Sequence, residues 1–500
     1  MSVAPEHAQQ LWSVLARHHH GKPASRRLFS AYYDTADYRL QSAGVVLRLR
    51  REGKRWIQTI KSAGNAAAGL HRRTEHETEV PTQLPSFPAM IEAGFGKLMA
   101  DKKTREALQV AFTTECKRSS TLIRPRAGTI IEVSLDRGAI VASERREPIC
   151  EIELELKTGD TDALFDLALE IARNLPVRLD NRSKSQRGYA LAAGIEPAPV
   201  KASTPPLSAD MTLDDAFVAV VFHSLAHLQD NEIGLLAGRN PEYLHQARIA
   251  LRRLRSAFRV FDAMIPKSHF SQALDGLKPV AHLLGDARDL DVFAVETLSQ
   301  AGSAQHAGVA ALRQRTQDAR RQAARAVRIA VAAPEYTVLL LRLARSLAAG
   351  QWRRETGRPA AANMTLLRFA TKLVSHRYAR VKRRNRHIGQ LGFAELHRLR
   401  IRVKRLRYAI EFFLPLFAGD RAKGALRTLV DLQALLGRIN DDATAWKLLD
   451  GLASEDASMD YQQAVGFLRG WCAHDAQQCC NRLQAAWKRF DESQPWRKSF

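Results

Sequence analysis

The chain has 500 residues, with 76 Lys and Arg against 52 Asp and Glu, a net charge of +24, and 45% hydrophobic residues. This length exceeds one domain of ordinary size, and the apolar content excludes wholesale disorder. No stretch approaches the roughly 18 apolar residues of a membrane span, and the N-terminus lacks the apolar core of a secretory signal. The five cysteines show no CxxC spacing, which excludes a disulfide framework or a cysteine zinc site. We therefore expect a cytoplasmic multidomain protein with a polyanionic partner and no membrane association.

The positive charge is concentrated in one part of the chain. Residues 1–200 carry 30 basic and 24 acidic side chains, whereas residues 301–400 carry 21 and 4. A proline-rich segment without periodicity separates the two regions, which is typical of an extended linker. We predict a first domain over 1–197, a linker over 198–207 and a second domain over 208–500.

The two regions differ in the period of their apolar residues. In the first, alternation of apolar and polar residues predicts antiparallel strands, and a helix is expected at 161–174. The strands are predicted at 45–51, 55–61, 129–136 and 149–157. The opening stretch 6–17 is helix-like. After the linker, an Ala-, Leu- and Arg-rich sequence with a period near 3.6 predicts helices throughout, so an α+β domain precedes an all-α domain.

A long repeat lies within the predicted all-α domain. The segment His245–Phe261 recurs as His397–Phe413, an offset of 152 positions, and the same offset carries Leu283–Asp289 onto Leu435–Asp441. A register held without a gap over this length indicates duplication of a multi-helix unit. We expect two pseudo-symmetric helical bundles.

Basic residues of the repeat share one helix face. They are His245, Arg248, Arg252 and Arg255 in the first copy and His397, Arg400, Lys404 and Arg407 in the second. His376 and Arg380 align in the same way on a further helix outside the repeat. A single stripe of this kind is more often a solvated face, but solvated faces usually include acidic residues and these have almost none. The stripe therefore predicts a bound polyanion.

Nearby aromatic residues lie on the opposite, core-facing side of these helices. Base stacking is consequently not expected, so a chain of phosphates fits better than nucleic acid. The histidines are expected to serve as phosphate donors that gain charge below a pH of about 6.5.

This helical region resembles the CHAD domain family in its H-x-x-R-I-x-x-[RK]-R-L-R helix, the duplicate of that helix and the L-L-G-x-x-x-D turns. The resemblance covers about 208–490 and implies a basic groove that binds inorganic polyphosphate, lined by the basic residues of the repeat. Glu411 occupies the place of Arg259, so the second stripe is expected to be shorter.

Charged residues also alternate along the strands of the first region. Arg48 and Arg50 share one face of a strand, and acidic residues do the same at 75–79 and 151–155. Each pattern alone is typical of a solvent-facing strand. Their recurrence on several strands favours a closed sheet with a charged interior, where cations hold phosphates and carboxylates hold Mg²⁺ or Mn²⁺. Such an arrangement hydrolyses a phosphoanhydride by metal-assisted attack of water.

The first region resembles the CYTH superfamily, the triphosphate tunnel metalloenzymes, in the segments Tyr32–Thr35, Leu47–Arg50, Gln58–Lys61, Ile131–Gly138, Glu151–Lys157 and Arg182–Lys184. The resemblance implies an eight-stranded antiparallel tunnel. It assigns triphosphate binding to Arg48, Arg50, Lys61, Arg118, Arg182 and Lys184. It assigns metal or water binding to Glu75, Glu77, Glu132, Glu151, Glu153 and Glu155.

One departure from this family concerns its E-x-E-x-K signature, which belongs on the first strand. The only match here, Glu153–Lys157, comes late in the region, so the first tunnel strand is expected to be missing from the chain. Either the recorded start is too far downstream, or catalytic ligands have been lost.

A CYTH domain joined to a CHAD domain resembles the bacterial inorganic triphosphatases. The resemblance implies metal-dependent hydrolysis of triphosphate to pyrophosphate and phosphate, with polyphosphate binding by the helical domain. The alternative is a non-catalytic polyphosphate-binding protein with a vestigial tunnel.

Overall fold

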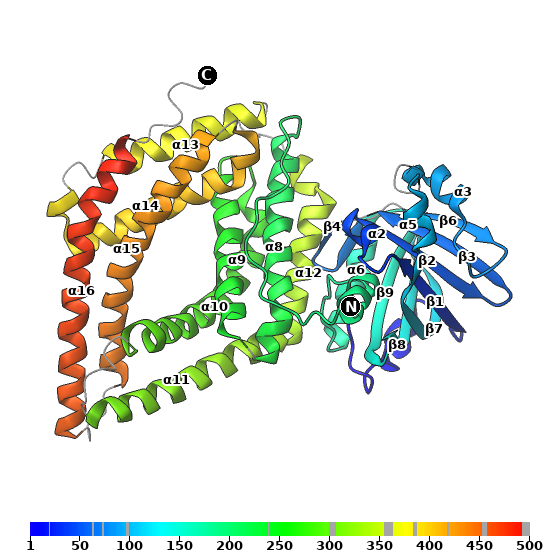
Figure 1. Cartoon of the computed structure of the whole chain (residues 1–500), viewed down its shortest axis with the longest axis horizontal. Helices are drawn as coiled ribbons and strands as arrows, with labels where there is room; N and C mark the ends of the chain where they lie inside the picture. Colours follow the sequence, from blue (N-terminus) through cyan, green and yellow to red (C-terminus); the bar gives the residue numbers. More distant parts are fainter. Residues whose placement is uncertain are drawn as a thin grey trace. The chain divides into compact units, whose positions relative to one another are not determined.

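The structure of the chain is a computed structural model, and its described residues are 1–19, 21–62, 65–72, 75–96, 100–238, 240–299, 307–354, 364–383, 388–417, 420–452 and 458–492. The chain forms two compact units (Figure 1). The first comprises Met1–Ala198 and Ala332–Ala349, and the second comprises Pro199–Val331 and Gly350–Phe500.

A seven-stranded antiparallel sheet forms the centre of the first unit, in the order β6-β3-β2-β1-β7-β8-β9. Its strands are β1 (Ala24–Asp34), β2 (Val45–Glu52), β3 (Arg55–Ser62), β6 (Glu75–Val80), β7 (Gln109–Arg126), β8 (Thr129–Ala142) and β9 (Arg145–Thr158). A separate hairpin pairs β4 (Asn65–Ala67) with β5 (Leu70–Arg72). The four predicted strand segments and the predicted fold class are confirmed.

The two faces of this sheet differ in chemistry because successive side chains of a strand point to opposite sides. On one face, Leu47 and Leu49 of β2 pack with Ile60 of β3 and Val80 of β6 in an apolar core. On the other face, register places Arg48 opposite Thr59 and Thr59 opposite Glu77. The predicted strand alternation therefore separates an apolar face from a charged one.

The first residues of the chain lie beside β9. Ser2 forms antiparallel bridges with Glu151 and with Arg178, and the amide of Val3 donates to the carbonyl of Cys150 at 3.1 Å. A short helix follows as α1 (Gln10–Val14) and η1 (Leu15–Arg17), which is shorter than the predicted 6–17 because residues before Gln10 form turns.

Three longer helices belong to the first unit: α6 (Thr161–Asn174), α7 (Lys184–Ala193) and α12 (Pro334–Ala349). The predicted helix at 161–174 is confirmed. Helix α7 begins at a capping box in which Ser183 and Gln186 satisfy each other's backbone amides. Helix α12 packs on α6, and the Thr337 hydroxyl donates to the Val177 carbonyl at 3.0 Å. Sequence periodicity alone groups α12 with the predicted all-α domain, whereas the structure places it in the first unit.

The remaining described elements of the first unit are short: α2 (Arg39–Ser42), α3 (Phe87–Met90), η2 (Ile91–Phe95) and α5 (Lys102–Glu106). Helix α5 is capped by Asp101, whose carboxylate accepts from the amide of Lys103.

The second unit is built from helices, as predicted for this region. Its long helices are α8 (Leu213–Ala237), α9 (Pro241–Val260), α10 (Lys267–Val292), α11 (Ala307–Ala332), α13 (Leu366–Arg383), α14 (Phe393–Phe413), α15 (Asp420–Leu452) and α16 (Met459–Glu492). Short segments are η3 (Phe293–Thr297), η5 (Gln351–Arg354), η7 (Ile388–Gln390) and η8 (Leu414–Leu416). None of the helices in the described part of the chain has the length and apolar character that a membrane crossing requires.

The repeated helices bury their aromatic residues, as the sequence predicts. Phe261 stacks on Phe369 and lies edge-on to Phe413, while Phe258 contacts Phe217. These rings are therefore unavailable for stacking on bases.

Candidate functional site

A cluster of three carboxylates lies on the charged face of the sheet in the first unit. Register places Asp136 of β8 directly opposite Glu151 of β9, and Glu153 follows two residues later on the same face. The three side chains each offer an oxygen, and these oxygens lie within 4.8 Å of one another. In the described part of the chain, this is the one group of three or more metal-ligating side chains that meets so closely.

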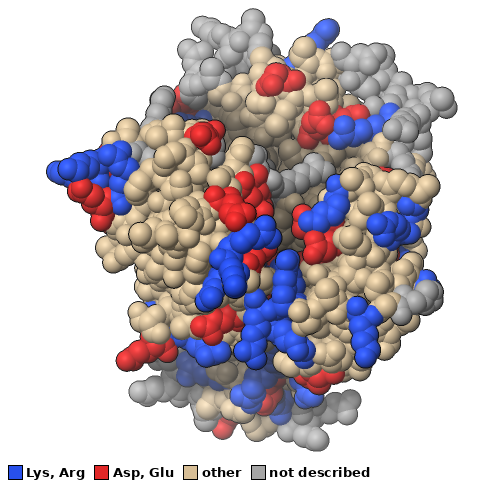
Figure 2. Space-filling model, turned by 90° about the vertical axis from the view of Figure 1, so that its right-hand side faces the viewer, with Lys and Arg blue, Asp and Glu red and all other residues tan. Residues whose placement is uncertain are grey.

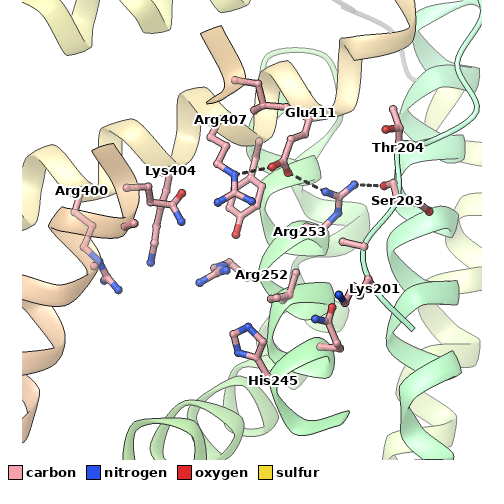
Figure 3. A pocket seen from close by; sticks show the side chains of 18 of the residues that line it. Lys201, Ser203, Thr204, His245, Arg252, Arg253, Arg400, Lys404, Arg407 and Glu411 are labelled. Atoms are coloured by element: carbon pink, nitrogen blue, oxygen red, sulfur yellow. Dashed lines mark hydrogen bonds and ion pairs between the residues drawn. The ribbon is translucent and has the colours of Figure 1, made fainter. Parts of the chain in front are cut away.

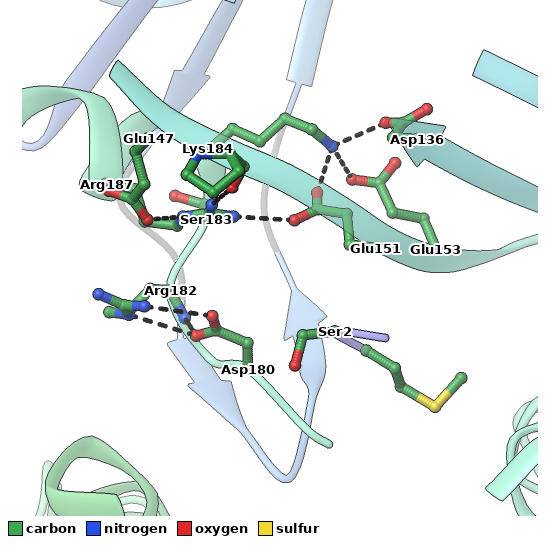
Figure 4. Close-up of polar contacts among 12 residues, drawn as sticks. Ser2, Asp136, Glu147, Glu151, Glu153, Asp180, Arg182, Ser183, Lys184 and Arg187 are labelled. Carbon is green, nitrogen blue, oxygen red and sulfur yellow. Dashed lines mark hydrogen bonds and ion pairs between the residues drawn. The ribbon is translucent and has the colours of Figure 1, made fainter. Parts of the chain in front are cut away.

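Two cations hold this carboxylate cluster together, and Figure 4 shows one of them, Lys184, among the three carboxylates. Lys184, the first residue of α7, contacts Glu151, lies 2.8 Å from Asp136 and lies 2.7 Å from Glu153. Arg118 of β7 donates to both oxygens of Asp136, at 2.7 and 2.6 Å. Burial acts to raise the pKa of Glu153, but Lys184 and Arg118 hold that pKa well below its ordinary value.

The carboxylate cluster has the chemistry of a site for a hard divalent cation. Asp and Glu oxygens are the ligands that Mg²⁺ and Mn²⁺ prefer. Asp136 is nearly inaccessible at 1% exposure, so its charge must be compensated, here by Lys184 and Arg118. A bound cation would provide the same compensation, so the donor set fits such a metal.

The other acidic residues assigned to the metal by resemblance lie elsewhere on the sheet. Glu132 and Glu155 both contact Lys157, at 3.0 and 2.7 Å. On β6, at the opposite edge of the sheet order, Glu75 lies 2.6 Å from Lys61 and Glu77 lies 3.2 Å from Arg48. Asp136 lies within the segment Ile131–Gly138, but the resemblance assigns it no role. The feature of the sequence that points to Asp136 is its position on the same strand face as Glu132, four residues further along β8.

The basic residues expected to bind triphosphate fall mainly on the same charged face. Burial lowers the pKa of Arg50, with Arg48 and Arg118 adding to the effect. Burial and Arg48 lower the pKa of Lys61 to about 8. Figure 2 shows Lys and Arg side chains gathered along a hollow with Asp and Glu beside them. Crowded cations of this kind favour binding of an anion.

Arg182 lies apart from this group and contacts Asp180 at 3.4 Å. A second residue of α7, Arg187, was not predicted but contacts Glu147 at 2.7 Å and Glu151 at 3.0 Å. Helix α7 thus presents two cations, one turn apart, to the acidic face of β9.

An aromatic cluster at the same face fixes the position of α7. Tyr32 stacks on Phe112 with ring centroids 4.4 Å apart, and Tyr189 lies edge-on to Phe112 at 5.1 Å. Gly188 lies against the same ring, where a Cβ atom would be 2.1 Å from Phe112. This close approach sets how far Lys184 reaches over β9.

In the second unit, the two copies of the repeat meet at a pocket of about 640 Å³ (Figure 3). Five of the predicted basic residues line it: His245, Arg252, Arg400, Lys404 and Arg407. Three of their nitrogens, His245 Nδ1, Arg252 Nε and Arg400 Nε, are buried without a hydrogen-bond partner among the described residues. Buried polar nitrogens without partners are costly, and an anion in the pocket would satisfy donors among them.

The cations of this pocket repel one another. Burial and the neighbouring Arg252, Arg400 and Arg248 lower the pKa of Lys404 to about 6. Burial and Arg288 lower the pKa of His245 to about 4. The expectation that the histidines gain charge below about 6.5 is therefore wrong for His245, because burial and its cationic neighbours oppose protonation.

The duplication is visible in matching ion pairs. Arg248 contacts Asp289 at 2.7 Å, and the residues 152 positions later, Arg400 and Asp441, lie 3.8 Å apart. Glu411, which breaks the repeat, accepts from Arg407 at 2.6 Å and from Arg253 at 2.9 Å. The stripe on α14 therefore ends at an acidic residue, as the sequence predicts.

The other predicted basic residues do not line the pocket. Arg248 is beside it, held by Asp289. His397 interacts with Asn440 at 2.9 Å, and Arg255, His376 and Arg380 lie outside the lining. Three basic lining residues were not predicted from the sequence: Arg253, Lys201 and Arg438. Arg253 lies outside the aligned stripe, and Lys201 lies in the segment predicted to be a linker.

Comparison with protein families assigns both units. The model of the CYTH domain matches residues 3–189, and the model of the CHAD domain matches residues 219–450.

Individual similar proteins are the following. An inorganic triphosphatase of Haemophilus influenzae is 30% identical over 198 residues, which are 39% of this chain and 54% of the relative, so the match spans about half of that relative's length. The crystal structure of the CHAD domain from the plant Ricinus communis is 31% identical, covers 58% of this chain and 96% of its own, and has a TM-score of 0.51. PptA from Streptomyces chartreusis is 15% identical, covers 56% of this chain and all of its own, and has a TM-score of 0.42.

Proposed function

Because the chain contains a CYTH domain followed by a CHAD domain, we propose that its first unit hydrolyses inorganic triphosphate to pyrophosphate and phosphate, and that its second unit binds inorganic polyphosphate. CYTH enzymes are triphosphate tunnel metalloenzymes, so this membership implies dependence on a divalent metal, which we propose to be Mg²⁺ or Mn²⁺. The five free cysteines support action in the reducing cytoplasm.

The observation that carries the enzymatic proposal is that one sheet face carries both a group of partly buried cations and the carboxylate cluster. Arg48, Arg50 and Lys61 lie on β2 and β3, whereas Asp136, Glu151 and Glu153 lie on β8 and β9. A triphosphate requires cations along its length and a metal at the phosphorus that reacts. Both requirements are met by residues of the same face.

The roles of the residues follow from this arrangement. The cations on β2 and β3 hold the phosphate oxygens and neutralise the charge that develops as the terminal P–O–P bond breaks. Asp136, Glu151 and Glu153 would hold the metal, which supplies a water polarised for attack on the terminal phosphorus. Water contributes its oxygen to the released phosphate, and pyrophosphate is the leaving group. Lys184 and Arg118 neutralise the carboxylates in this structure, and both would be available to contact phosphate if a metal took over that neutralisation.

This proposal is tested by phosphate release from triphosphate with Mg²⁺ or Mn²⁺. Replacing a metal ligand, Glu153→Gln, is expected to lower the rate by more than about a hundredfold, because loss even of groups that only support a ligand costs 10–100-fold. The matched control is Glu144→Gln, an exposed carboxylate at the turn after β8, which should leave the rate unchanged. Equal rates in the two variants would rule out the assigned metal site.

A second candidate is a non-catalytic polyphosphate-binding protein. The observation in its favour is that Lys184 contacts all three carboxylates of the cluster, as a structural ion-pair network would. Absence of phosphate release by the unaltered chain with either metal would favour this candidate.

The binding proposal for the second unit is supported by the buried cations of the pocket. Replacing Arg252 and Lys404 together by Ala is expected to abolish salt-sensitive binding of long-chain polyphosphate, because two of the central cations are removed. Binding should also survive competition by DNA, because the one Phe, Tyr or Trp ring among the described residues that line the pocket, Tyr408, is only 4% exposed and lies under Arg252. Unchanged binding in the double variant would show that the pocket is wrongly assigned.

A further inference from the structure

The segment before α8 is not a free linker but is fixed along α8 and α9. Val200 is held at both of its backbone polar groups: its amide donates to Asn231 Oδ1, and its carbonyl accepts from Asn231 Nδ2, both at 3.0 Å. His227 Nε2 lies 3.0 Å from the same carbonyl. Asn231 is fully buried and His227 is 5% exposed, so these are interior groups committed to holding the segment.

A second attachment lies three residues later at Ser203. The Arg253 guanidinium, which is 4% exposed, donates to the Ser203 carbonyl at 2.8 Å. His223 Nε2 lies 3.1 Å from that carbonyl and from the Ser203 hydroxyl oxygen. The three α8 residues are four positions apart, on one helix face. We call residues 199–204 the strap.

The strap forms one wall of the basic pocket. Lys201, Ala202, Ser203 and Thr204 all line it, facing His245 and Arg252 of α9 and Lys404 of α14 (Figure 3). One path of hydrogen bonds and ion pairs connects this wall to the opposite helix. It runs from Ser203 to Arg253, on to Glu411 at 2.9 Å, and from there to Arg407 at 2.6 Å.

We propose that the strap is part of the anion-binding site, with Lys201 as a ligand that lies outside the helical repeat, so that a polyanion in the pocket further stabilises the strap that α8 and α9 already hold. Lys201 is exposed and forms no ion pair with a carboxylate among the described residues. A phosphate chain reaching the pocket mouth therefore meets this ammonium as well as the helical cations. This inference rests on the proposed polyphosphate binding by the second unit.

The consequence is that ligand binding acts on one of the three chain segments that join the two units. The strap begins at Pro199, directly after the first part of the first unit ends at Ala198. Occupancy of the pocket would add contacts at Lys201, between the attachments at Val200 and Ser203. The ordering of this segment is then coupled to the anion.

The test uses the full chain and long-chain inorganic polyphosphate. Lys201→Glu is expected to weaken binding by at least about fivefold relative to the matched control Lys488→Glu, an exposed lysine on α16 with the same change of charge. Hydrogen–deuterium exchange of 199–204 should slow when polyphosphate is added to the unaltered chain. Lys201→Glu should reduce that slowing.

The outcomes separate this inference from the function on which it rests. Failure of the unaltered chain to bind polyphosphate would overturn both. Binding that Lys404→Ala weakens, but with equal affinities for Lys201→Glu and Lys488→Glu and unchanged exchange in the strap, would overturn the inference and leave the binding function intact.

Discussion

At the scale of single residues, Lys404 has the surroundings that the proposed binding of an anion to the second unit would require. Its amine is buried among Arg252, Arg400 and Arg248, and burial together with these charges lowers its pKa to about 6. A lysine in these surroundings is mostly neutral at neutral pH when the pocket is empty. A bound phosphate chain reverses the local potential and raises the pKa again.

Polyphosphate binding is therefore expected to take up protons. Between pH 6 and the higher pKa of the bound state, binding takes up as much as about one proton at Lys404, so affinity falls as pH rises through this window. The measurement is calorimetric titration in two buffers of different ionisation enthalpy at pH 7.5, where the observed heats should differ in proportion to those enthalpies.

Lys404→Met is the control for this uptake, because it keeps the length of the side chain and removes the titrating amine. It should bind more weakly and with less proton uptake. If the heat of binding depended on the buffer equally in the unaltered chain and in Lys404→Met, the proton would be taken up by another group.

At the scale of elements, α7 connects the core of the first unit to its charged face. Tyr189 packs on Phe112 from one side of the helix, while Lys184 at its first turn contacts the carboxylates of β8 and β9. The approach of α7 to β7 is set by Gly188, whose hydrogen faces the Phe112 ring. The position of Lys184 over β9 thus depends on how α7 packs against Phe112 of β7, two strands away in the sheet.

Gly188→Ala is expected to destabilise the first unit by about 1–3 kcal/mol, because the added methyl overlaps the Phe112 ring and the helix must move. Thermal unfolding followed by circular dichroism measures the loss. The same substitution at Gly470 in α16, where an added Cβ meets nothing within 4 Å, should be neutral or stabilising. Equal effects at both positions would contradict the packing assigned to α7.

At the scale of the whole molecule, the chain does not divide at one boundary. Helix α12 belongs to the first unit although it lies more than a hundred residues beyond the strap, so the chain passes between the units three times. Arg345 of α12 contacts Asp166 of α6 at 2.9 Å, and Tyr336, Leu340 and Leu343 are buried. The first unit therefore includes apolar residues supplied from within the CHAD region.

A fragment ending at Ala198 is consequently expected to be less stable than the same fragment fused through a flexible linker to 332–349. Covering the face of α6 buries several large apolar side chains, which favours the fused fragment by about 3 kcal/mol or more. Chemical denaturation of both fragments measures the difference. A fusion carrying Leu340→Asp should lose most of this gain in stability. If all the fragments were equally stable, α12 would not be part of the first unit.

Part of the candidate site could be predicted because strand periodicity is local. Alternation over 149–157 places Glu151 and Glu153 on one face of their strand, whichever strand lies beside it, and the structure shows their carboxylates together. Asp136 joins them only through the register of β8 with β9, which alternation within one strand does not specify. Lys184 arrives from a helix whose placement depends on Phe112 and Tyr189.

The sequence by itself determined the strands, the helices, the duplication and the faces that carry charge, because these follow from periods of two and 3.6 residues and from an offset of 152 positions. Tertiary structure alone decided which charges meet. The joining of Arg253 to Ser203 and Glu411, the strap as a wall of the pocket and the transfer of α12 to the first unit are contacts between residues distant in the chain. Such contacts depend on how three-dimensional packing satisfies buried polar and apolar groups, and no local pattern encodes that.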